Sequence, residues 1–561
     1  MKTPSAAQLQ VRDHQSLSLL VVAPAGCGKT EALAMRVAGL LESGRIVPPQ
    51  RVLAVTFTNR AKDNIHDRLR EHLSYGTLRD HVTVSNFHGL ASRIIRAHAN
   101  VIGLDPDIIT PDSDWVRERC HEHLGLRWDP IFEVERVLRV TKQEAIDDAA
   151  VGSALAISGN EIAARIEKQR LIENRATYDD LLRYAELILA NDVVAGLYKN
   201  HFGAVIVDEY QDLTDQQFRV LNLLADGNAT FAGDLAQGIY SFTGANPTAI
   251  HARITATCDD IIEFNESHRS SPAVLSMVNA MNSLTGGTDL ECALPGSWPS
   301  AGLAGRIIFS TAEDEAAWIT KVSRAILARA PGHRIGVMTR VKSRLRFIDE
   351  HLGGSDLDVH RWEDGYLDTE TAGIVRALLR RIDVSDLAAA TDRLAYIRAQ
   401  VDWTKVEEPD TRRSLMDALT WVLERLDEGL TTADIGSRIK VGDQTTLLNA
   451  PGVHLLSGHV GKGQQFDWAL VVGAEEGNIP FFKAESEAEL TEEARILGVM
   501  ISRARHGVVL TAANSVRTLS GNPRDRPLSQ FWSELDAAAP MGQSDLVGWL
   551  KAAPWEQIAA R

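Results

Sequence analysis

Short runs of consecutive apolar residues, bounded by glycine or polar residues, recur in both halves of the chain. Runs of this length predict strands that are buried on both faces, which are typical of parallel sheets covered by helices. In the first half the runs lie at residues 17–22, 52–56, 82–84, 204–207 and 229–232. In the second half they lie at residues 306–310, 335–339, 453–457, 468–472 and 508–511. Helical patterns separate the runs, so the sequence predicts an α/β protein with two parallel sheets flanked by helices.

Two longer stretches interrupt this alternation. Residues 91–180 are mostly helical in pattern and rich in charge, and helices rich in alanine and leucine follow one another near residues 366–440. We therefore expect two lobes, each with a helical insertion. The expected parts are a first lobe (1–90 and 181–265), its insertion (91–180), a second lobe (266–350 and 450–535), its insertion (351–449) and a C-terminal tail (536–561).

Composition narrows the class of protein but not its function. A chain of 561 residues is too long for one core. The net charge of −16 leans away from nucleic acid, although a groove can be locally basic on an acidic protein. The four scattered cysteines show no zinc spacing, and we find no secretion signal or apolar run that could span a bilayer. We therefore expect a cytoplasmic protein without membrane association.

The first apolar run leads into Ala-Pro-Ala-Gly-Cys-Gly-Lys-Thr (residues 23–30), followed by helix-forming residues. This is the P-loop pattern with alanine in place of its first glycine. Gly26, Cys27 and Gly28 would curl the backbone so that its amides face a phosphate at a helix N-terminus. Lys29 can reach the β- and γ-phosphates of ATP, and the Thr30 hydroxyl can bind Mg²⁺. The plainer alternative is a glycine-rich turn before a helix.

The run at 204–207 ends in Asp208 and Glu209. A carboxylate at the end of a strand can hold the Mg²⁺ that bridges the nucleotide phosphates, a role for Asp208. The adjacent Glu209 can orient and deprotonate the attacking water. Asp-Glu pairs are also common on solvated loops, but this pair follows a buried strand in a chain that already has a P-loop pattern.

Asp-Glu-Tyr-Gln-Asp (residues 208–212) resembles motif II of the UvrD/Rep-type helicases of superfamily 1, and further segments resemble the other motifs of that family in its order. They are residues 54–61 (motif Ia), 84–88 (Ib), 177–182 (the Asp-Asp-Leu-Leu segment), 232–245 (III), 267–270 (IV), 457–466 (V) and 492–504 (VI). The resemblance implies two RecA-like P-loop lobes and covers residues 4–533.

The resemblance also implies roles at the ATP site. Gln8 would read the adenine edge, and Gln237 would sense the γ-phosphate. Arg269 and Arg503 would act as arginine fingers from the second lobe, the alternative being surface salt bridges. The remaining positions implied to contact the nucleotide are His268, Gly463 and Gln465. The family has Tyr at the position of His268 and Glu at the position of Gln465. It has Ser at the position of Gly238 and Arg at the position of Thr243. No departure removes a phosphate or metal ligand, so we expect an active ATPase.

On the DNA side, the resemblance places Phe57, Tyr240 and Phe242 against successive bases of single-stranded DNA, stacking that tolerates any sequence. Core packing is the alternative for Phe57. The other positions implied to contact DNA, mostly through backbone phosphates, are Thr58, Asn59, His88, Arg340 and His459.

Together these features predict an ATP- and Mg²⁺-dependent helicase or translocase that moves 3′→5′ on single-stranded DNA and at single-strand/duplex junctions. Repair, recombination or phage defence would be its setting. The second interpretation is a DNA-stimulated ATPase that serves as the motor subunit of a complex with a partner nuclease and unwinds little alone. An ATP-driven switch and a P-loop kinase are alternatives from other classes. The 351–449 insertion is small for this family, which favours translocation over independent unwinding.

Overall fold

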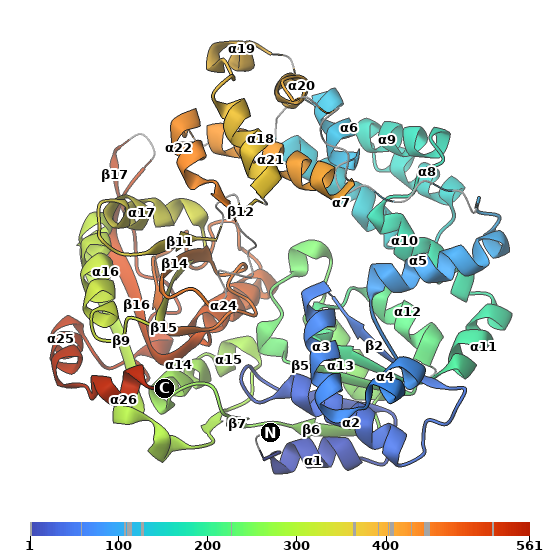
Figure 1. The fold of residues 1–561 in the computed structure, drawn as a ribbon, viewed down its shortest axis with the longest axis horizontal. Coiled ribbons are helices and arrows are strands. Elements are labelled where there is room, and N and C mark those ends of the chain that lie inside the picture. Colours follow the sequence, from blue (N-terminus) through green and yellow to red (C-terminus); the bar gives the residue numbers. More distant parts are fainter. Residues whose placement is uncertain are drawn as a thin grey trace.

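The computed structural model describes residues 3–57, 59–105, 108, 111, 115–124, 128–225, 227–362, 366–367, 369–390, 392–401, 403, 409–427, 429–441, 449–518 and 521–561. Two sheets flanked by helices lie side by side, and two groups of helices lie across from them and meet each other (Figure 1). The expectation of an α/β fold with two helix-flanked parallel sheets is confirmed. None of the helices in the described ranges is both long enough and apolar enough to cross a membrane.

The first sheet has the strand order β3-β2-β4-β5-β1-β6, and all its neighbouring strands are parallel. Its strands are β1 (Leu19–Val22), β2 (Arg51–Thr56), β3 (Val82–Asn86), β4 (Phe202–Asp208), β5 (Ala229–Gly233) and β6 (Asp260–Glu263). Five of them match apolar runs in the sequence. The edge strand β6 was not predicted, because Ile262 is its one buried residue and no apolar run marks it.

Alternate residues of β1 face opposite sides of this sheet, with Leu19 and Val21 in one core and Leu20 and Val22 in the other. The first face is covered by α1 (Ala6–Asp13), α2 (Lys29–Glu42), α3 (Asn59–His72) and α4 (Tyr75–His81). The second face is covered by α5 (Phe87–His98), α10 (Tyr178–Leu189), α11 (Asp192–His201), α12 (Asp215–Ala225) and α13 (Pro247–Thr257). The expected insertion limits at residues 91 and 180 therefore lie inside helices that belong to the core of the first lobe.

Between α5 and α10, four helices form a small separate core around Trp115 and Leu138. They are α6 (Trp115–Leu124), α7 (Trp128–Lys142), α8 (Asp148–Ile157) and α9 (Glu161–Ile172). A buried ion pair between the Lys142 ammonium and Asp180, at 2.8 Å, attaches this insertion to α10.

The second sheet has the order β11-β14-β10-β15-β16, with β9 and the antiparallel β17 also paired to the long β16. Its strands are β9 (Leu303–Thr311), β10 (Arg334–Thr339), β11 (Val359–Arg361), β14 (Gly452–Ser457), β15 (Phe466–Val471), β16 (Ala504–Arg517) and β17 (Pro523–Asp525). Strand β11 lies within residues 351–449, the range expected for the second insertion, yet it pairs with β14 of the sheet.

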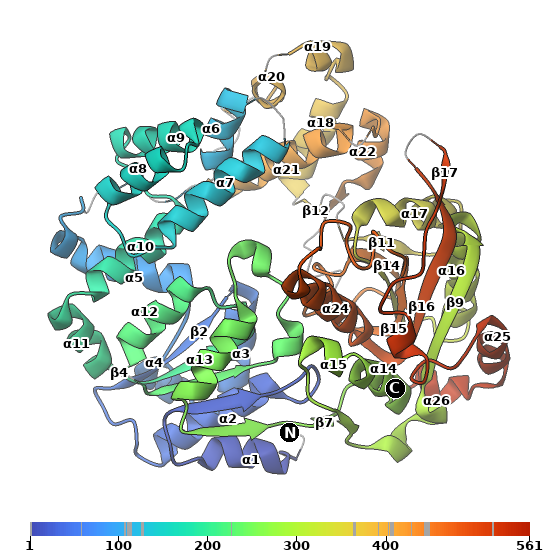
Figure 2. The same ribbon diagram turned by 180° about the vertical axis from the view of Figure 1, so that it is seen from behind.

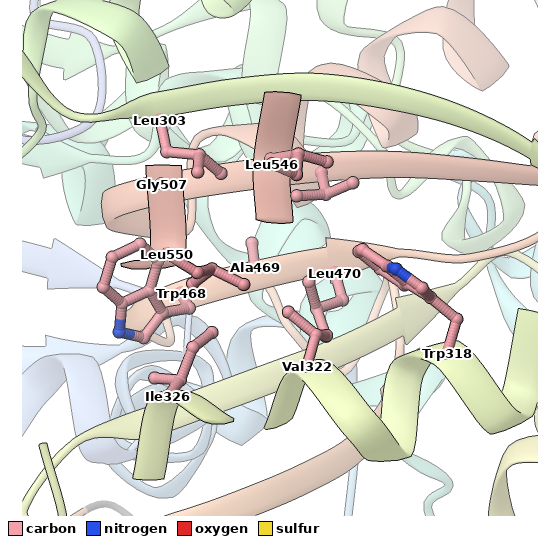
Figure 3. A pocket seen from close by; sticks show the side chains of 11 residues that line it. Leu303, Trp318, Val322, Ile326, Trp468, Ala469, Leu470, Gly507, Leu546 and Leu550 are labelled. Carbon is pink, nitrogen blue, oxygen red and sulfur yellow. The ribbon is translucent and has the colours of Figure 1, made fainter. Parts of the chain in front are cut away.

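One face of the second sheet is covered by α14 (Pro272–Ala280), α15 (Asn282–Thr285) and α24 (Glu487–Ile501). The other is covered by α16 (Ala312–Leu327), α17 (Arg346–Gly353), α25 (Gln543–Ala552) and α26 (Trp555–Ala559). Leu546 and Leu550 of α25 line an apolar cavity of about 10 Å³ together with Trp468, and Figure 3 shows Leu550 beside the Trp468 ring. That volume is at the lower limit for a single water molecule, so this cavity holds no larger ligand.

The second insertion is a compact group of helices with its own apolar core. It contains α18 (Thr369–Leu379), α19 (Val384–Ala389), α20 (Arg393–Ala399), α21 (Pro409–Asp427) and α22 (Thr432–Arg438), with the short pair β12 (Tyr366–Leu367) and β13 (Lys440–Val441) at its base. The Arg398 guanidinium lies 2.8 Å from the Glu118 carboxylate of the first insertion. Figure 2 shows the two insertions side by side at this point.

Candidate active site

The P-loop connects β1 to α2, and its backbone requires glycine at two positions. Gly26 and Gly28 have φ angles of +91° and +83°. A Cβ at Gly26 would lie 2.6 Å from the Cβ of Arg269, and one at Gly28 would lie 2.5 Å from Nε2 of Gln8. Because α2 begins at Lys29, this loop presents its amides at a helix N-terminus, where an anion is favoured.

Gln8 supports this loop from α1. Its Nε2 donates a hydrogen bond to the carbonyl of Gly28 at 3.2 Å, and its Oε1 accepts one from the backbone of Ser5 at 2.9 Å. The side chain expected to read adenine is therefore fixed beside the phosphate loop. Cys27 is buried within the same loop, and burial raises the pKa of its thiol to about 12, so it is an inert small side chain here.

The Lys29 ammonium contacts both acidic residues that follow β4. It lies 3.1 Å from Asp208 Oδ1 and 2.6 Å from Glu209 Oε2. Burial alone would lower the pKa of Lys29, but the two carboxylates raise it above its usual value. Burial raises the pKa of Asp208 despite the opposing charge of Lys29. Thr30 lies half-buried in the first turn of α2, one residue further on.

Glu209 has a left-handed backbone, with φ +57° and ψ +47°. Its Oε2 accepts a hydrogen bond from Gln211 Nε2 at 2.5 Å. Burial would raise the pKa of Glu209, but the charges of Lys29 and Lys462 lower it below its usual value. The carboxylate is therefore ionised at neutral pH, which is the form a general base requires.

A chain of hydrogen bonds extends from Glu209 across the first lobe. Gln211 Oε1 accepts from the backbone of Asp234 at 3.0 Å, and Asp234 Oδ2 accepts from Gln237 Nε2 at 2.8 Å. Gln237 Oε1 in turn accepts from Arg503 Nη2 of the second lobe at 3.5 Å. The structure thus connects motifs II, III and VI through hydrogen bonds, one of which is donated by the Asp234 backbone.

Arg269 and Arg503 bring two guanidinium groups to this region from the second-lobe side. Arg503 is 2% exposed, and its guanidinium donates to the backbone of Val499 and to the Ser502 hydroxyl. Burial, reinforced by the nearby charge of Arg269, lowers the pKa of Arg503 to about 9. Burial also lowers the pKa of Arg269. Among the described residues no carboxylate forms an ion pair with either group, so the site presents positive charge that an anion would balance.

Lys462 and Asp212 form an ion pair between the lobes that the sequence analysis did not single out. The Lys462 ammonium lies 2.6 and 2.7 Å from the Asp212 carboxylate oxygens, and both side chains are 8% exposed. The ammonium also lies 4.4 Å from the centre of the Tyr240 ring. Burial raises the pKa of Asp212 to about 6, although Lys462 opposes that rise. Asp212 lies in the segment that resembles motif II, and Lys462 lies in the segment that resembles motif V. Their charges inside these motifs were the signal by which the sequence could have identified the pair.

The other expected nucleotide contacts are exposed. The backbone of His268 donates to the Gly26 carbonyl at 3.2 Å, which places motif IV against the P-loop, while the His268 side chain is exposed. Gly463 and Gln465 are exposed on the second lobe, and Gly463 has a φ of +83°.

The side chains expected to contact DNA form two groups. In the first lobe, Phe57 is half-buried with its ring 5.4 Å from that of Phe87, at the margin of the core. His88 packs edge-on against Tyr178 at 5.5 Å. Thr58 and the side chain of Asn59 lie outside the described residues.

In the second group, rings from both lobes meet. Phe242 is 56% exposed, and its ring centre lies 5.9 Å from Tyr240 and 5.6 Å from His459 of the second lobe. Arg340 is paired with Glu493 at 2.8 Å, and its guanidinium lies 5.0 Å from the Phe481 ring. The Arg340 charge is therefore balanced within the protein.

Comparison with known proteins shows sequence similarity to helicases. Residues 5–256 match the UvrD/REP helicase N-terminal domain, and residues 389–515 match the UvrD-like helicase C-terminal domain. The chain is 28% identical over 575 residues to the ATP-dependent DNA helicase UvrD2 of Mycobacterium tuberculosis, which covers 94% of this chain and 80% of the relative.

Two further relatives also match over most of the chain. The ATP-dependent DNA helicase PcrA of Leuconostoc citreum is 25% identical over 628 residues, covering 92% of this chain and 82% of the relative. The ATP-dependent DNA helicase UvrD1 of Mycobacterium tuberculosis is 26% identical over 683 residues, covering 99% and 86%. The chain therefore belongs to the UvrD/Rep family of superfamily 1 ATP-dependent DNA helicases.

Proposed function

We propose that this chain hydrolyses ATP in the cleft between its lobes to move 3′→5′ along single-stranded DNA. The observation that carries the proposal is the hydrogen-bonded path from Glu209 through Gln211, Asp234 and Gln237 to Arg503. This path joins a candidate general base to a guanidinium of the other lobe, and its member Gln237 lies three residues before the aromatic Tyr240.

In the proposed reaction, the P-loop amides and Lys29 bind the β- and γ-phosphates. Glu209 accepts a proton from the attacking water, whose oxygen bonds to the γ-phosphorus as the bond to ADP breaks. Arg269 and Arg503 neutralise the charge on the transferred phosphoryl group. Gln8 and His268 lie beside the P-loop, where they would hold the nucleotide base, and Gly463 and Gln465 would face the ribose.

The oxygen donors of Thr30 and Asp208 fit Mg²⁺, which prefers such ligands beside nucleotide phosphates. The Lys29 ammonium already balances Asp208 at 3.1 Å, so a cation belongs at this carboxylate. When bound, Mg²⁺ would supply charge neutralisation for the phosphates. Lys29 would then transfer its contact from Asp208 to the nucleotide.

Coupling to DNA follows from the position of Gln237. A change at the γ-phosphate would alter the contacts of Gln237 with Asp234 and Arg503. Because Tyr240 and Phe242 follow Gln237 closely in the chain, the position of this segment would change as well. Bases stacked on Phe57, Tyr240 and Phe242 would shift as the lobes close, with Asn59, Thr58, His88 and His459 along the DNA backbone. The 3′→5′ direction is carried over from the UvrD/Rep resemblance.

A second candidate function is a motor subunit that works with a partner nuclease in repair, recombination or phage defence. The small insertion α18–α22 favours it, because one compact helical group offers less surface to grip a duplex.

The experiment is a strand-displacement assay with 3′-tailed and 5′-tailed duplexes, run beside a single-strand-stimulated ATPase assay. We expect stimulation that is nearly independent of base sequence and decreases with salt, and unwinding from 3′ tails. Unwinding of 5′-tailed substrates alone would refute the direction. Turnover indifferent to single-stranded DNA would refute the function.

A further inference from the structure

Phe482 is a large apolar side chain that the second lobe holds out of its core. It lies in the loop after β15 and is 65% exposed. This loop is well fixed: Asn478 Oδ1 accepts from the backbone of Val341 at 3.2 Å, and the backbone of Phe481 donates to Glu493 at 2.9 Å. The exposure of Phe482 is therefore a property of the fold, and it leaves this ring accessible to a ligand.

The loop lies on the same edge of the sheet as two residues already expected to contact DNA. Strands β10, β14 and β15 are parallel neighbours, so their carboxyl ends lie together. Arg340 follows β10, His459 follows β14, and Phe482 lies in the loop that follows β15. Ligands of open parallel sheets bind at this edge.

Ring contacts and a neighbouring charge connect this edge with the aromatic group of the first lobe. Phe242 contacts His459, whose pKa is lowered by burial and further by the nearby charge of Arg340. The Arg340 guanidinium lies over the Phe481 ring at 5.0 Å. The Phe481 and Phe482 ring centres are 4.6 Å apart. A series of aromatic and basic side chains thus extends from Phe242 to Phe482.

The charges around Phe482 are mixed. The Lys483 ammonium lies 5.8 Å from its ring, and Arg526 borders the same loop through a 3.1 Å hydrogen bond to the Glu476 carbonyl. Exposed Glu485 and Glu487 follow closely in the chain. Such a surface attracts no phosphate strongly, so the ring itself is the feature that a ligand would use.

We propose that Phe482 is a base-stacking residue that extends the single-stranded DNA contact surface onto the second lobe, where one nucleobase packs on its exposed face. The contact is independent of base identity, because every base offers a π-face. This inference rests on the proposed function, since it requires DNA along the Phe242–His459 group.

The test is binding of labelled oligothymidylates of increasing length to the full chain, measured by fluorescence anisotropy for wild type, Phe482→Ala and Phe482→Trp. We expect Phe482→Ala to bind long oligonucleotides about tenfold more weakly and to bind the shortest ones normally. Affinity should stop rising at a shorter length in this variant. Phe482→Trp should restore the wild-type profile, and the dependence of affinity on salt should stay unchanged in both variants.

Tyr75→Ala is the matched control, because Tyr75 is 76% exposed on α4, which precedes the amino end of β3. It should bind like wild type. If wild type binds oligonucleotides and Phe482→Ala matches it at every length, or loses affinity equally at every length, the inference is overturned while the proposed function stands. If wild type binds none of the oligonucleotides, the proposed function fails first.

Discussion

Glu209 carries its carboxylate on a left-handed backbone that residues other than glycine seldom adopt. Such a conformation costs about 1–3 kcal/mol and persists where the surroundings fix it. Here the fixed partners are Lys29 and Gln211, which hold the carboxylate from two sides. This backbone conformation directs the side chain toward the P-loop, which is consistent with the proposed role of Glu209 as general base.

At this scale the first prediction concerns Glu209→Gln. The amide keeps the size of the side chain but cannot accept the proton, so DNA-stimulated ATP turnover should fall by about 10²–10⁴-fold while ATP still binds. Steady-state ATPase and nucleotide-binding assays measure the two effects. Turnover near the wild-type rate would refute the assignment of the base.

Lys29→Ala should differ from Glu209→Gln in its binding defect. It removes charge from the β- and γ-phosphate positions, so both nucleotide affinity and turnover should fall. It also leaves Asp208 and Glu209 close together without their shared cation. A variant that retains wild-type nucleotide affinity would contradict the role given to Lys29.

A third prediction follows from the Asp212–Lys462 pair, whose two members come from different lobes. Lys462→Met leaves a buried carboxylate unpaired, which should lower the free energy of unfolding by about 3–5 kcal/mol. Urea denaturation measures this effect, and Asp212→Asn combined with Lys462→Met should recover part of it. Equal stability of wild type and Lys462→Met would contradict the contact.

Among the elements, helix α24 contacts both the proposed DNA-binding residues and the proposed ATP site. Near its middle, Glu493 holds Arg340 and the Phe481 backbone, while Glu492 accepts a hydrogen bond from the backbone of Ser241 of the first lobe at 3.0 Å. The helix ends at Ile501, about 12 Å along its axis from Glu493, and Arg503 follows two residues later. This helix therefore connects the edge of the sheet that we expect to contact DNA with the proposed ATP site.

The fourth prediction tests the charge that α24 balances. Glu493→Gln keeps a hydrogen-bonding partner for Arg340 but removes the negative charge, so the guanidinium becomes available to a phosphate. We expect tighter binding to single-stranded DNA and a salt dependence steeper by about one ion. A titration of affinity against salt measures both. An unchanged slope would mean that Arg340 does not face the DNA.

The elements that the sequence predicted are those with a strong local signal. All ten apolar runs correspond to strands, because a buried strand is specified by neighbouring residues. The P-loop, a glycine turn of the same local kind, lies in contact with Asp208 and Glu209. The edge strands β6 and β11 were missed because β6 is largely exposed and β11 only partly buried. The path through Gln211 and Asp234 and the Asp212–Lys462 pair depend on distant parts of the chain, so no local pattern announces them.

For the molecule as a whole, the contact between Arg398 and Glu118 joins the two insertions above the lobes. The second insertion is a single small helical group, which offers limited surface for a duplex. We expect the isolated chain to show rapid single-strand-stimulated ATPase but weak unwinding of a 3′-tailed duplex. Rapid, processive unwinding without a partner would defeat this expectation and the motor-subunit interpretation.

Acid should destabilise the second lobe through His454 and His506. Burial lowers the pKa of each to about 3, with Arg334 near His454 and His333, Asp467, Arg505 and Arg561 near His506. Because the unfolded value is about 6.5, the unfolded chain gains protons first as pH falls. The stabilising effect of the neutral rings is present above about pH 6.5 and is lost toward pH 3, by about 1.4 kcal/mol per pH unit for each histidine.

Urea denaturation at several pH values between about 7 and 5 measures this decline. His506→Phe should make it shallower, because the ring can no longer take up a proton in the unfolded chain. Substitution of the exposed His351 should leave it as in wild type. A pH-independent midpoint would contradict the buried neutral state.

Arg503 reaches the cleft from the second lobe, whereas the Glu209 carboxylate belongs to the first. On the proposed assignment, a molecule whose lobes drift apart separates the group that activates water from the charge needed by the transferred phosphoryl. Idle protein would then leave the cellular ATP pool almost untouched. The amount of ATP hydrolysed would then report how long the protein stays bound to DNA.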